Sequence, residues 1–136
     1  FRSTDGGASW QVANTGLSNL SIWHLVVSPT DSRTIFAATD GGIYRSDDRG
    51  QSWTLAGSAA DTQRTYCLAI HPAKRRTIYA GTAGGGVLVS MDNGLTWGSI
   101  NDGLGNDVVQ ALTISPDGCA RLHAGTNDGI WERAGN

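Results

Sequence analysis

The stretch Ser46–Trp53, which reads Ser-Asp-Asp-Arg-Gly-Gln-Ser-Trp, decides the fold of this chain. Its pattern, S-x-D-x-G-x-[ST]-W, occurs again at Ser3–Trp10 and at Ser90–Trp97, so the unit recurs every 43–44 residues. A fixed period of this length indicates a repeat architecture in which each unit is one supersecondary structure. We call the three octapeptides the boxes. Their defining positions are Ser3, Asp5, Gly7, Trp10, Ser46, Asp48, Gly50, Trp53, Ser90, Asp92, Gly94 and Trp97.

The sequence between the boxes repeats in step with them. Each unit contains four short runs rich in apolar, β-branched and aromatic residues, separated by Gly, Asn, Asp and Pro, which is typical of strands joined by turns. We name the runs strands a to d. Strand a is expected near 22–28, 65–71 and 108–115, strand b near 34–39, 77–82 and 121–126, strand c near 42–46, 86–90 and 129–133, and strand d from Trp10, Trp53 and Trp97 onward.

Four strands in one repeat of this length match one blade of a β-propeller. The main rival is a repeat of paired helices, but no sustained periodicity of 3.6 residues is present, and each of the 19 glycines would cost a helix about 1 kcal/mol. We therefore predict an all-β fold of about three four-stranded antiparallel blades that form an incomplete ring. The whole of 1–136 is one propeller segment. Its repeats are 1–43, 44–87 and 88–130, with 131–136 completing a third strand.

Three blades are fewer than the usual four to eight of a closed ring. The chain also begins inside a repeat at Phe1 and reaches a strand c, but no box, at its other end. We expect other protein chains to complete the ring, either a second copy or the remainder of a larger propeller. The strand d that follows Trp10 is expected to pair with the open edge of the strand near 129–133.

The residue types of the box suit a tight turn between strands c and d. The Asp accepts hydrogen bonds from N–H groups just ahead of it, the Gly permits a positive φ, and the Trp covers the hairpin. Three identical copies on three blades do not converge on one site. We therefore interpret the boxes as structural turns rather than as catalytic carboxylates or calcium ligands.

The three octapeptides resemble the Asp-box, or BNR, repeat, and the resemblance extends over the whole chain. Proteins with such boxes include sialidases, sortilin-type receptors, xyloglucan-degrading endoglucanases and the photosystem II stability and assembly factors. The run Gly42–Trp53 is most similar to the last two groups and to related secreted or periplasmic proteins. The resemblance implies a propeller whose box lies away from the binding face, in an extracellular, periplasmic or organelle-lumen protein.

Composition excludes several function classes. The formal net charge is −2 and Lys74–Arg76 is the only basic run, so a nucleic-acid partner is not expected. No apolar stretch is long enough for a membrane span. Cys67 and Cys119 are too few for a disulfide framework, and a bond between them is not expected. Cys67 and His71 are about 13 Å apart along a strand, too far to share a zinc ion, so neither a metal nor another cofactor is predicted.

The candidate ligand face is the one formed by the b–c turns and the d–a loops 13–21, 57–65 and 101–107. Trp23 and Tyr66 break the repeat early in strand a, where they could stack on a sugar or peptide or else pack between blades. Three aspartates, Asp40, Asp107 and Asp128, lie in turns or loops on the same face.

Two function classes stay open at this point. The favoured class is a non-catalytic binding or scaffold module that engages a protein or a glycan on this face. The alternative is part of a carbohydrate-active enzyme, a glycoside hydrolase of the Asp-box propeller type that uses two aspartates. A sialidase is not expected because Glu132 is the only glutamate and no Tyr–Glu pair is evident.

Overall fold

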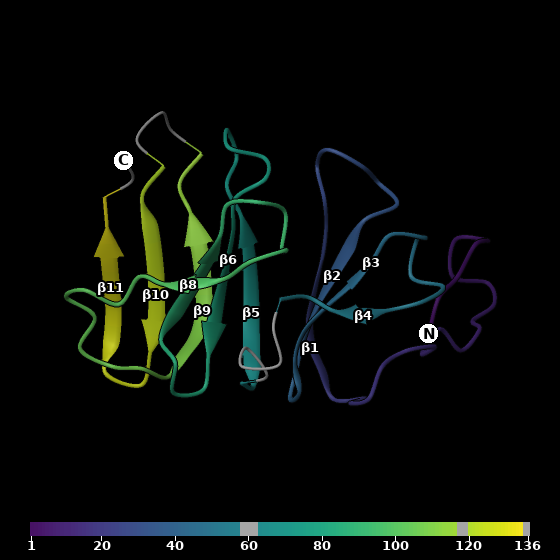
Figure 1. Cartoon of the computed structure of the whole chain (residues 1–136), viewed down its shortest axis with the longest axis horizontal. Helices are drawn as coiled ribbons and strands as arrows, with labels where there is room; N and C mark the ends of the chain where they lie inside the picture. Colours follow the sequence, from purple (N-terminus) through teal and green to yellow (C-terminus); the bar gives the residue numbers. More distant parts are fainter. Residues whose placement is uncertain (58–62, 117–119, 135–136) are drawn as a thin grey trace.

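The computed structural model describes residues 1–57, 63–116 and 120–134, and every regular element in them is a β-strand. The strands form two four-stranded sheets and one three-stranded sheet, which follow one another along the molecule in chain order (Figure 1). The first sheet contains β1 (Ile22–Val27), β2 (Ile35–Thr39), β3 (Gly42–Ser46) and β4 (Thr54–Leu55). The second contains β5 (Thr65–Ile70), β6 (Ile78–Thr82), β7 (Val87–Ser90) and β8 (Gly98–Ser99). The third contains β9 (Val109–Ile114), β10 (Leu122–Thr126) and β11 (Gly129–Arg133).

Each sheet is a meander in which neighbouring strands pair antiparallel, in the order a, b, c, d in the first two sheets and a, b, c in the described residues of the third. This confirms the predicted all-β class, with partial propeller blades in an open ring. Strand d begins one residue later than predicted, at Thr54 and Gly98, and is only two residues long. The reason is visible at Trp53, whose N–H donates to the carbonyl of Thr15 in the preceding repeat, at 2.8 Å, instead of joining its own sheet.

Strand b contributes buried residues on both of its faces, because each face is covered. Alternate residues of a strand point to opposite sides of the sheet. In β2, Phe36 and Ala38 therefore pack toward the second sheet, against Leu68 and Ile78, and Ala37 packs toward the preceding segment. The next junction, between the second and third sheets, is built by the same positions. Its buried members are Val87, Val109, Leu122 and Ala124.

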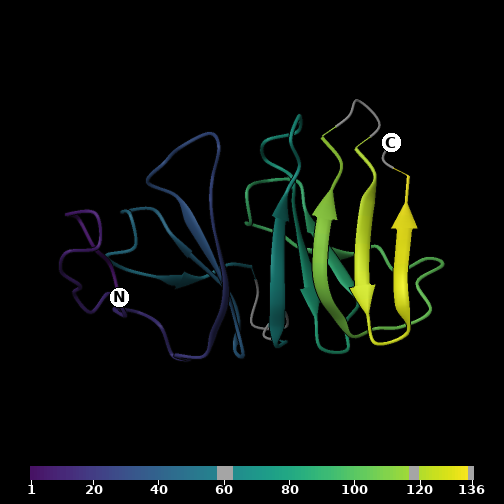
Figure 2. The same ribbon diagram turned by 180° about the vertical axis from the view of Figure 1, so that it is seen from behind.

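The outer faces of the first and third sheets are partly exposed. Leu25 is 56% exposed, whereas Leu68, which occupies the same position of the second sheet, is 3% exposed because the first sheet covers it. At the other end Ile130 is 81% exposed on β11. Figure 2 shows the third sheet from behind, and among the described residues no other sheet lies beyond β11.

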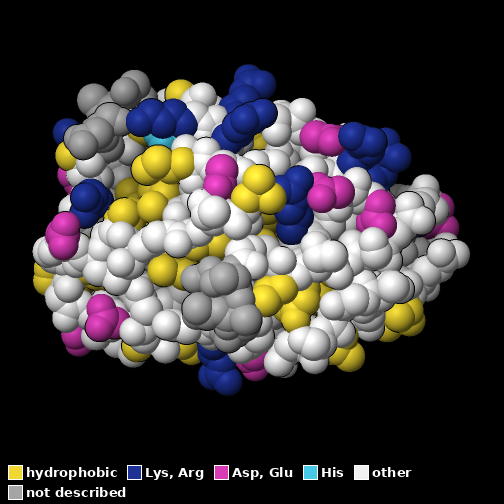
Figure 3. All heavy atoms as spheres, viewed as in Figure 1, with side chains coloured by type: hydrophobic (Ala, Val, Ile, Leu, Met, Phe, Trp, Pro, Cys, Tyr) yellow, Lys and Arg dark blue, Asp and Glu magenta, His cyan; other side chains and the backbone are white. Residues whose placement is uncertain are grey.

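The two opposite edges of the three sheets are formed by different connections. The a–b turns and the boxes share one edge, since the N–H of Arg49 donates to the carbonyl of Arg33 and that of Asn93 to the carbonyl of Arg76. This is the upper edge in Figure 1, and most Lys and Arg side chains visible in Figure 3 lie along it. The b–c turns and the d–a connections form the opposite edge. Among the described residues no helix is long and apolar enough to cross a membrane.

A candidate ligand face and the box turns

Strand a of every sheet contains a β-bulge at the same position. Pairing shifts between Ile22 and His24 in β1 and between Thr65 and Cys67 in β5, which leaves Trp23 and Tyr66 as the extra residues. In the third sheet the equivalent residue is Gln110, between Val109 and Ala111. A bulge redirects the side chain of the extra residue. A position at which the three repeats carry different residues is therefore also the position of the bulge.

Trp23, Tyr66 and Asp40 come together at the boundary between the first two sheets. The Tyr66 ring stands edge-on to the Trp23 ring, with centroids 5.5 Å apart and an interplanar angle of 79°. The indole Nε1–H of Trp23 donates to Oδ1 of Asp40 at 2.7 Å. This bond fixes the orientation of an indole that is 52% exposed.

A fourth side chain, Arg64, completes this group and was missed by sequence reasoning. Its Nε lies 2.7 Å from the same oxygen of Asp40. A hydrogen bond with Tyr66, together with the charge of Asp40, raises the pKa of the guanidinium. The sequence does carry a signal, because Arg64 stands where the other repeats have Ser21 and Val108. We call Trp23, Asp40, Arg64 and Tyr66 the aromatic cluster.

The other two predicted residues lie beside the third sheet and not in the aromatic cluster. The backbone carbonyl of Asp107 accepts the N–H groups of Gly84 and Gly86, each at 2.9 Å, and its side chain is exposed. Asp128 accepts a hydrogen bond from the side-chain amide of Asn106 at 2.6 Å. Of the loop 57–65, residues 58–62 lie outside the described part of the chain.

The titratable side chains of the described residues do not form a metal site, as no group of three or more His, Cys, Asp or Glu could hold an ion there. Burial raises the pKa of the Cys67 thiol to about 11, so the thiol is protonated at neutral pH. Cys119 lies outside the described residues. The ring of His71 accepts the backbone N–H groups of Ala73 and Lys74 at 3.1 and 3.0 Å, which organises the a–b turn.

Each box is a closed network of hydrogen bonds. In the second box Asp48 Oδ1 accepts the N–H groups of Gln51 and Ser52, both at 2.9 Å, and the Ser52 hydroxyl donates to Oδ2. Ser46 Oγ donates to Asp48 at 2.8 Å and accepts the N–H of Gly50 at 2.8 Å. Both oxygens of the Asp48 carboxylate thus accept hydrogen bonds from residues of the box itself.

The same bonds favour the ionised form of each box aspartate. The Ser52 hydroxyl and N–H hold the pKa of Asp48 well below its usual range, and Ser9 does the same for Asp5. Thr96 lowers the pKa of Asp92 to about 2. The second and third boxes are on the edge of the a–b turns, opposite the aromatic cluster.

An arginine links each of the first two repeats to the box that follows it. Arg45 on β3 donates from Nη1 to the carbonyl of Asn93 at 2.9 Å, and Arg2 donates likewise to Arg49 at 3.4 Å. Both acceptors have positive φ, 64° at Asn93 and 62° at Arg49, which turns their carbonyls toward the preceding repeat. The sequence signal is an Arg directly before the first Ser of a box. In the third repeat Val89 occupies this position.

A family model matches most of the chain. It is described as sortilin, neurotensin receptor 3 (Sortilin-Vps10), and it matches residues 1–106. No curated protein sequence matches the chain.

Solved structures with the same fold include GH74 enzymes and the protein YCF48. An ancestral GH74 enzyme has a TM-score of 0.72 and 22% identity, covering 87% of this chain and 18% of that chain. The GH74 xyloglucanase from Xanthomonas campestris has a TM-score of 0.60 and 21% identity, covering 84% and 20%. YCF48 from Cyanidioschyzon merolae has a TM-score of 0.60 and 16% identity, covering 88% and 38%. The chain thus spans well under half the length of each of these proteins.

Proposed function

Because this chain belongs to the Sortilin-Vps10 family, we propose that it is a non-catalytic binding module that engages a protein or a glycan on the face of the b–c turns and d–a connections. The family description names a receptor, which is a binding function. As a scaffold of repeated sheets, the fold offers a broad face built from loops of several blades.

The aromatic cluster is the observation that carries this proposal. Trp23 presents about half of its surface to solvent, yet Asp40 and Tyr66 hold the ring in one orientation. An ordered, exposed indole loses little entropy when a ligand packs on it, which favours its use as an anchor. Its position at a bulge, where the repeats differ, separates it from the residues that all repeats need for folding.

The environment of Asp40 argues against a catalytic role for its carboxylate. One oxygen of Asp40 accepts a hydrogen bond from the Trp23 indole and forms an ion pair with the Arg64 guanidinium. The carboxylate is therefore already paired within the protein. Glycoside hydrolysis uses two carboxyl groups about 5–9.5 Å apart on either side of the scissile bond. The remaining candidates, Asp107 and Asp128, belong to the third sheet. A hydrolase would have to use Asp107 with a carboxylate outside the aromatic cluster.

A glycan array and a peptide array, each read with the whole chain, test the proposal. For any ligand found, Trp23→Ala should weaken binding at least tenfold, because it removes the exposed anchor. Leu95→Ala is the matched control, since Leu95 is 64% exposed but lies in a box on the opposite edge. Equal affinity of the Trp23→Ala variant would contradict the proposal. So would release of reducing sugar from xyloglucan or sialosides that disappears in Asp107→Asn.

A further inference from the structure

The a–b turn and the box of the second sheet carry cations beside exposed apolar side chains. The turn contains the basic run Lys74–Arg76, whose three residues are all exposed. In the third box Met91 is 73% exposed and Leu95 is 64% exposed. The N–H of Asn93 in this box donates to the carbonyl of Arg76 at 3.0 Å, so the turn and the box form one continuous edge. We call Lys74–Arg76, Met91 and Leu95 the basic–apolar edge.

The same edge of the first sheet carries acids at two of these positions. Asp31 and Asp47 each form an ion pair with an arginine two residues away, at 3.0 and 2.8 Å. Counting along the repeat, Lys74 stands in place of Asp31 and Met91 in place of Asp47. At this edge the second sheet therefore has a cation and an apolar side chain where the first sheet has two carboxylates.

The exposure of the two apolar side chains is a property of their positions in the box. Asp47, the equivalent of Met91, has a side chain that is 60% exposed, although Arg45 beside it reaches the next box. Gln51, the equivalent of Leu95, is exposed as well. Of the three boxes, only the third carries a large apolar side chain at both positions.

The box presents these side chains on a fixed backbone. The N–H of Leu95 donates to Oδ1 of Asp92 at 3.0 Å, and the N–H of Thr96 donates to the same oxygen at 2.9 Å. The Ser90 hydroxyl also donates to Asp92, at 2.7 Å. The one carboxylate of this box is thus bound within the turn, and the apolar side chains remain at the surface beside the cations.

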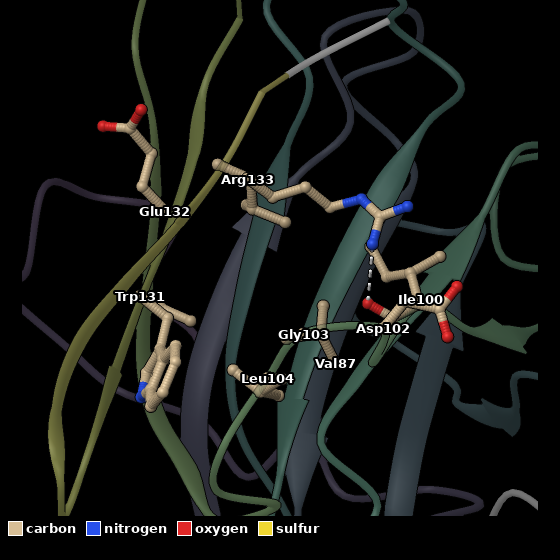
Figure 4. Close-up of a pocket in the computed structure, with 10 residues that line it drawn as sticks. Val87, Ile100, Asp102, Gly103, Leu104, Trp131, Glu132 and Arg133 are labelled. Atoms are coloured by element: carbon tan, nitrogen blue, oxygen red, sulfur yellow. Dashed lines mark hydrogen bonds between the residues drawn. The ribbon is translucent and has the colours of Figure 1, made fainter.

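The positive charge of this edge comes from the basic run. None of the ion pairs among the described residues involves Arg75 or Arg76. Arg133 on β11 is directed elsewhere, since its guanidinium borders a cavity of about 140 Å³ between the second and third sheets and donates to the carbonyl of Ile100 at 3.4 Å (Figure 4). In Figure 3 hydrophobic side chains lie directly beside Lys and Arg side chains along the upper edge.

We propose that the basic–apolar edge docks on an anionic lipid surface. Lys and Arg side chains close to an anionic membrane are attracted to its headgroups. Apolar side chains on the same surface enter the boundary between the headgroups and the acyl chains. Met91 suits this role because an unbranched thioether adapts to an irregular apolar environment.

The apolar side chains favour a lipid surface over other anionic partners. The charged backbones of nucleic acids and sulfated polysaccharides would attract Lys74–Arg76 but would not bury Met91 and Leu95. A stable interface with an acidic protein needs about 20–30 residues on each side, many more than this edge supplies. Contacts with a lipid surface add up one side chain at a time, so a small cluster on two neighbouring turns is sufficient.

Docking by this edge leaves the candidate ligand face free. The aromatic cluster lies on the opposite edge, so a chain held at a membrane by its a–b turn and box presents Trp23 away from the lipid. Vesicle binding and ligand binding are therefore separate measurements, and the inference does not depend on the proposed binding function.

Sedimentation with vesicles tests the proposal on the whole 136-residue chain. The chain is expected to bind vesicles of equimolar phosphatidylcholine and phosphatidylglycerol, and not vesicles of phosphatidylcholine alone. Arg75→Ser, which installs the residue of the first repeat, should weaken binding about fivefold, the typical effect of one cation near an anionic membrane. The charge-matched control is Asn127→Asp, in an exposed turn on the opposite edge, which should leave binding unchanged. Binding to both kinds of vesicle or to neither, or equal effects of the two variants, would overturn the proposal.

The apolar contribution is tested without any change of charge. The double variant Met91→Gln with Leu95→Gln should keep the fold, because the second box has polar residues at both positions. Its affinity for the mixed vesicles should fall about tenfold or more, since two apolar side chains lose their burial. An unchanged affinity would contradict docking on lipid.

A fluorescent label tests whether the edge enters the lipid. Cys67 is buried, so in a Cys119→Ser background Leu95→Cys provides the reactive thiol for an environment-sensitive dye. Its emission should shift to the blue on the mixed vesicles and stay unchanged with heparin or duplex DNA. Leu20→Cys is the matched control, because Leu20 is 66% exposed on the opposite edge. A shift at both positions or at neither, or a shift with heparin, would overturn the proposal.

Discussion

The hydroxyl oxygen of Ser90 accepts the backbone N–H of Gly94 at 2.8 Å, and both residues are buried. The same hydroxyl donates to Asp92 at 2.7 Å. One small side chain thus satisfies an N–H group that water does not reach and orients the carboxylate that closes the turn. The box depends on its Ser as much as on the Asp for which it is named.

Replacing Ser90 by Ala should therefore lower the free energy of unfolding by about 1–3 kcal/mol, the typical cost of an unsatisfied buried donor. Urea unfolding followed by tryptophan fluorescence measures the change. Ser99→Ala on β8 is the control, because Ser99 is exposed and should change stability by less than about 0.5 kcal/mol. Equal effects of the two variants would mean that the Ser90 bond contributes nothing to stability.

Acid should weaken the fold through the box aspartates. Their pKa values are lower in the folded chain than the ordinary 3.8, and that of Asp92 is about 2. A depressed pKa adds stability that is present above pH 4 and is lost as the pH falls toward 2, since the unfolded chain binds more protons there. Urea midpoints at pH 7, 4, 3 and 2 should fall across the lower window. The fall should be shallower in Asp92→Asn, and an identical pH dependence would contradict this account.

Arg45 should stabilise the junction between the first two sheets. Its side chain is only 20% exposed, lies over the Phe36 ring at 6.0 Å, and donates to the carbonyl of Asn93. Arg45→Met keeps much of the packing and removes the bond, so unfolding should become easier by about 1–2 kcal/mol. Asp47→Ala removes the exposed partner of Arg45 and should cost less than about 1 kcal/mol. The reverse order would place the stabilising contact at Asp47.

Asp40→Asn should loosen the Trp23 ring without unfolding the chain. The indole N–H loses an ionised acceptor, and Arg64 loses its counter-charge. Hydrogen exchange at the indole N–H, followed by NMR, should become about tenfold faster, which corresponds to about 1.4 kcal/mol. The indole of Trp53, which donates to a backbone carbonyl, serves as the internal reference. Unchanged exchange at Trp23 alone would show that Asp40 does not hold the ring.

Much of this fold can be read from the sequence because the repeat supplies three independent copies of the same pattern. Strands β3 and β11 begin and end where the apolar runs predict. The bulges could not be predicted, since an alternation of period two does not reveal one extra residue in a pair. In the second repeat strand d starts one residue after Trp53, because the N–H of Trp53 bonds to Thr15 of the preceding repeat.

The candidate face was only partly predictable for a related reason. The repeat assigned Trp23 and Tyr66 to equivalent positions of neighbouring blades, but the ring contact between them depends on how the blades pack. Asp107 was expected on the same face as Asp40. The N–H groups of Gly84 and Gly86, in the b–c turn at 83–86 of this face, donate to the backbone carbonyl of Asp107. Arg64 could not be assigned to the site from the sequence, because its contact with Asp40 depends on how the first two sheets pack.

The arginine bond between repeats has a consequence for how such chains grow. Arg45 reaches a carbonyl in the next unit, and Arg2 reaches the equivalent carbonyl one unit earlier, so donor and acceptor of the junction are encoded within a single repeat. A gene duplication that copies the first unit whole would therefore create a new boundary already supplied with both partners. Copying the third unit would not, because Val89, which stands in place of the arginine there, has no side-chain donor. The residue directly before each box therefore determines whether a duplicated repeat brings this arginine bond to its new boundary.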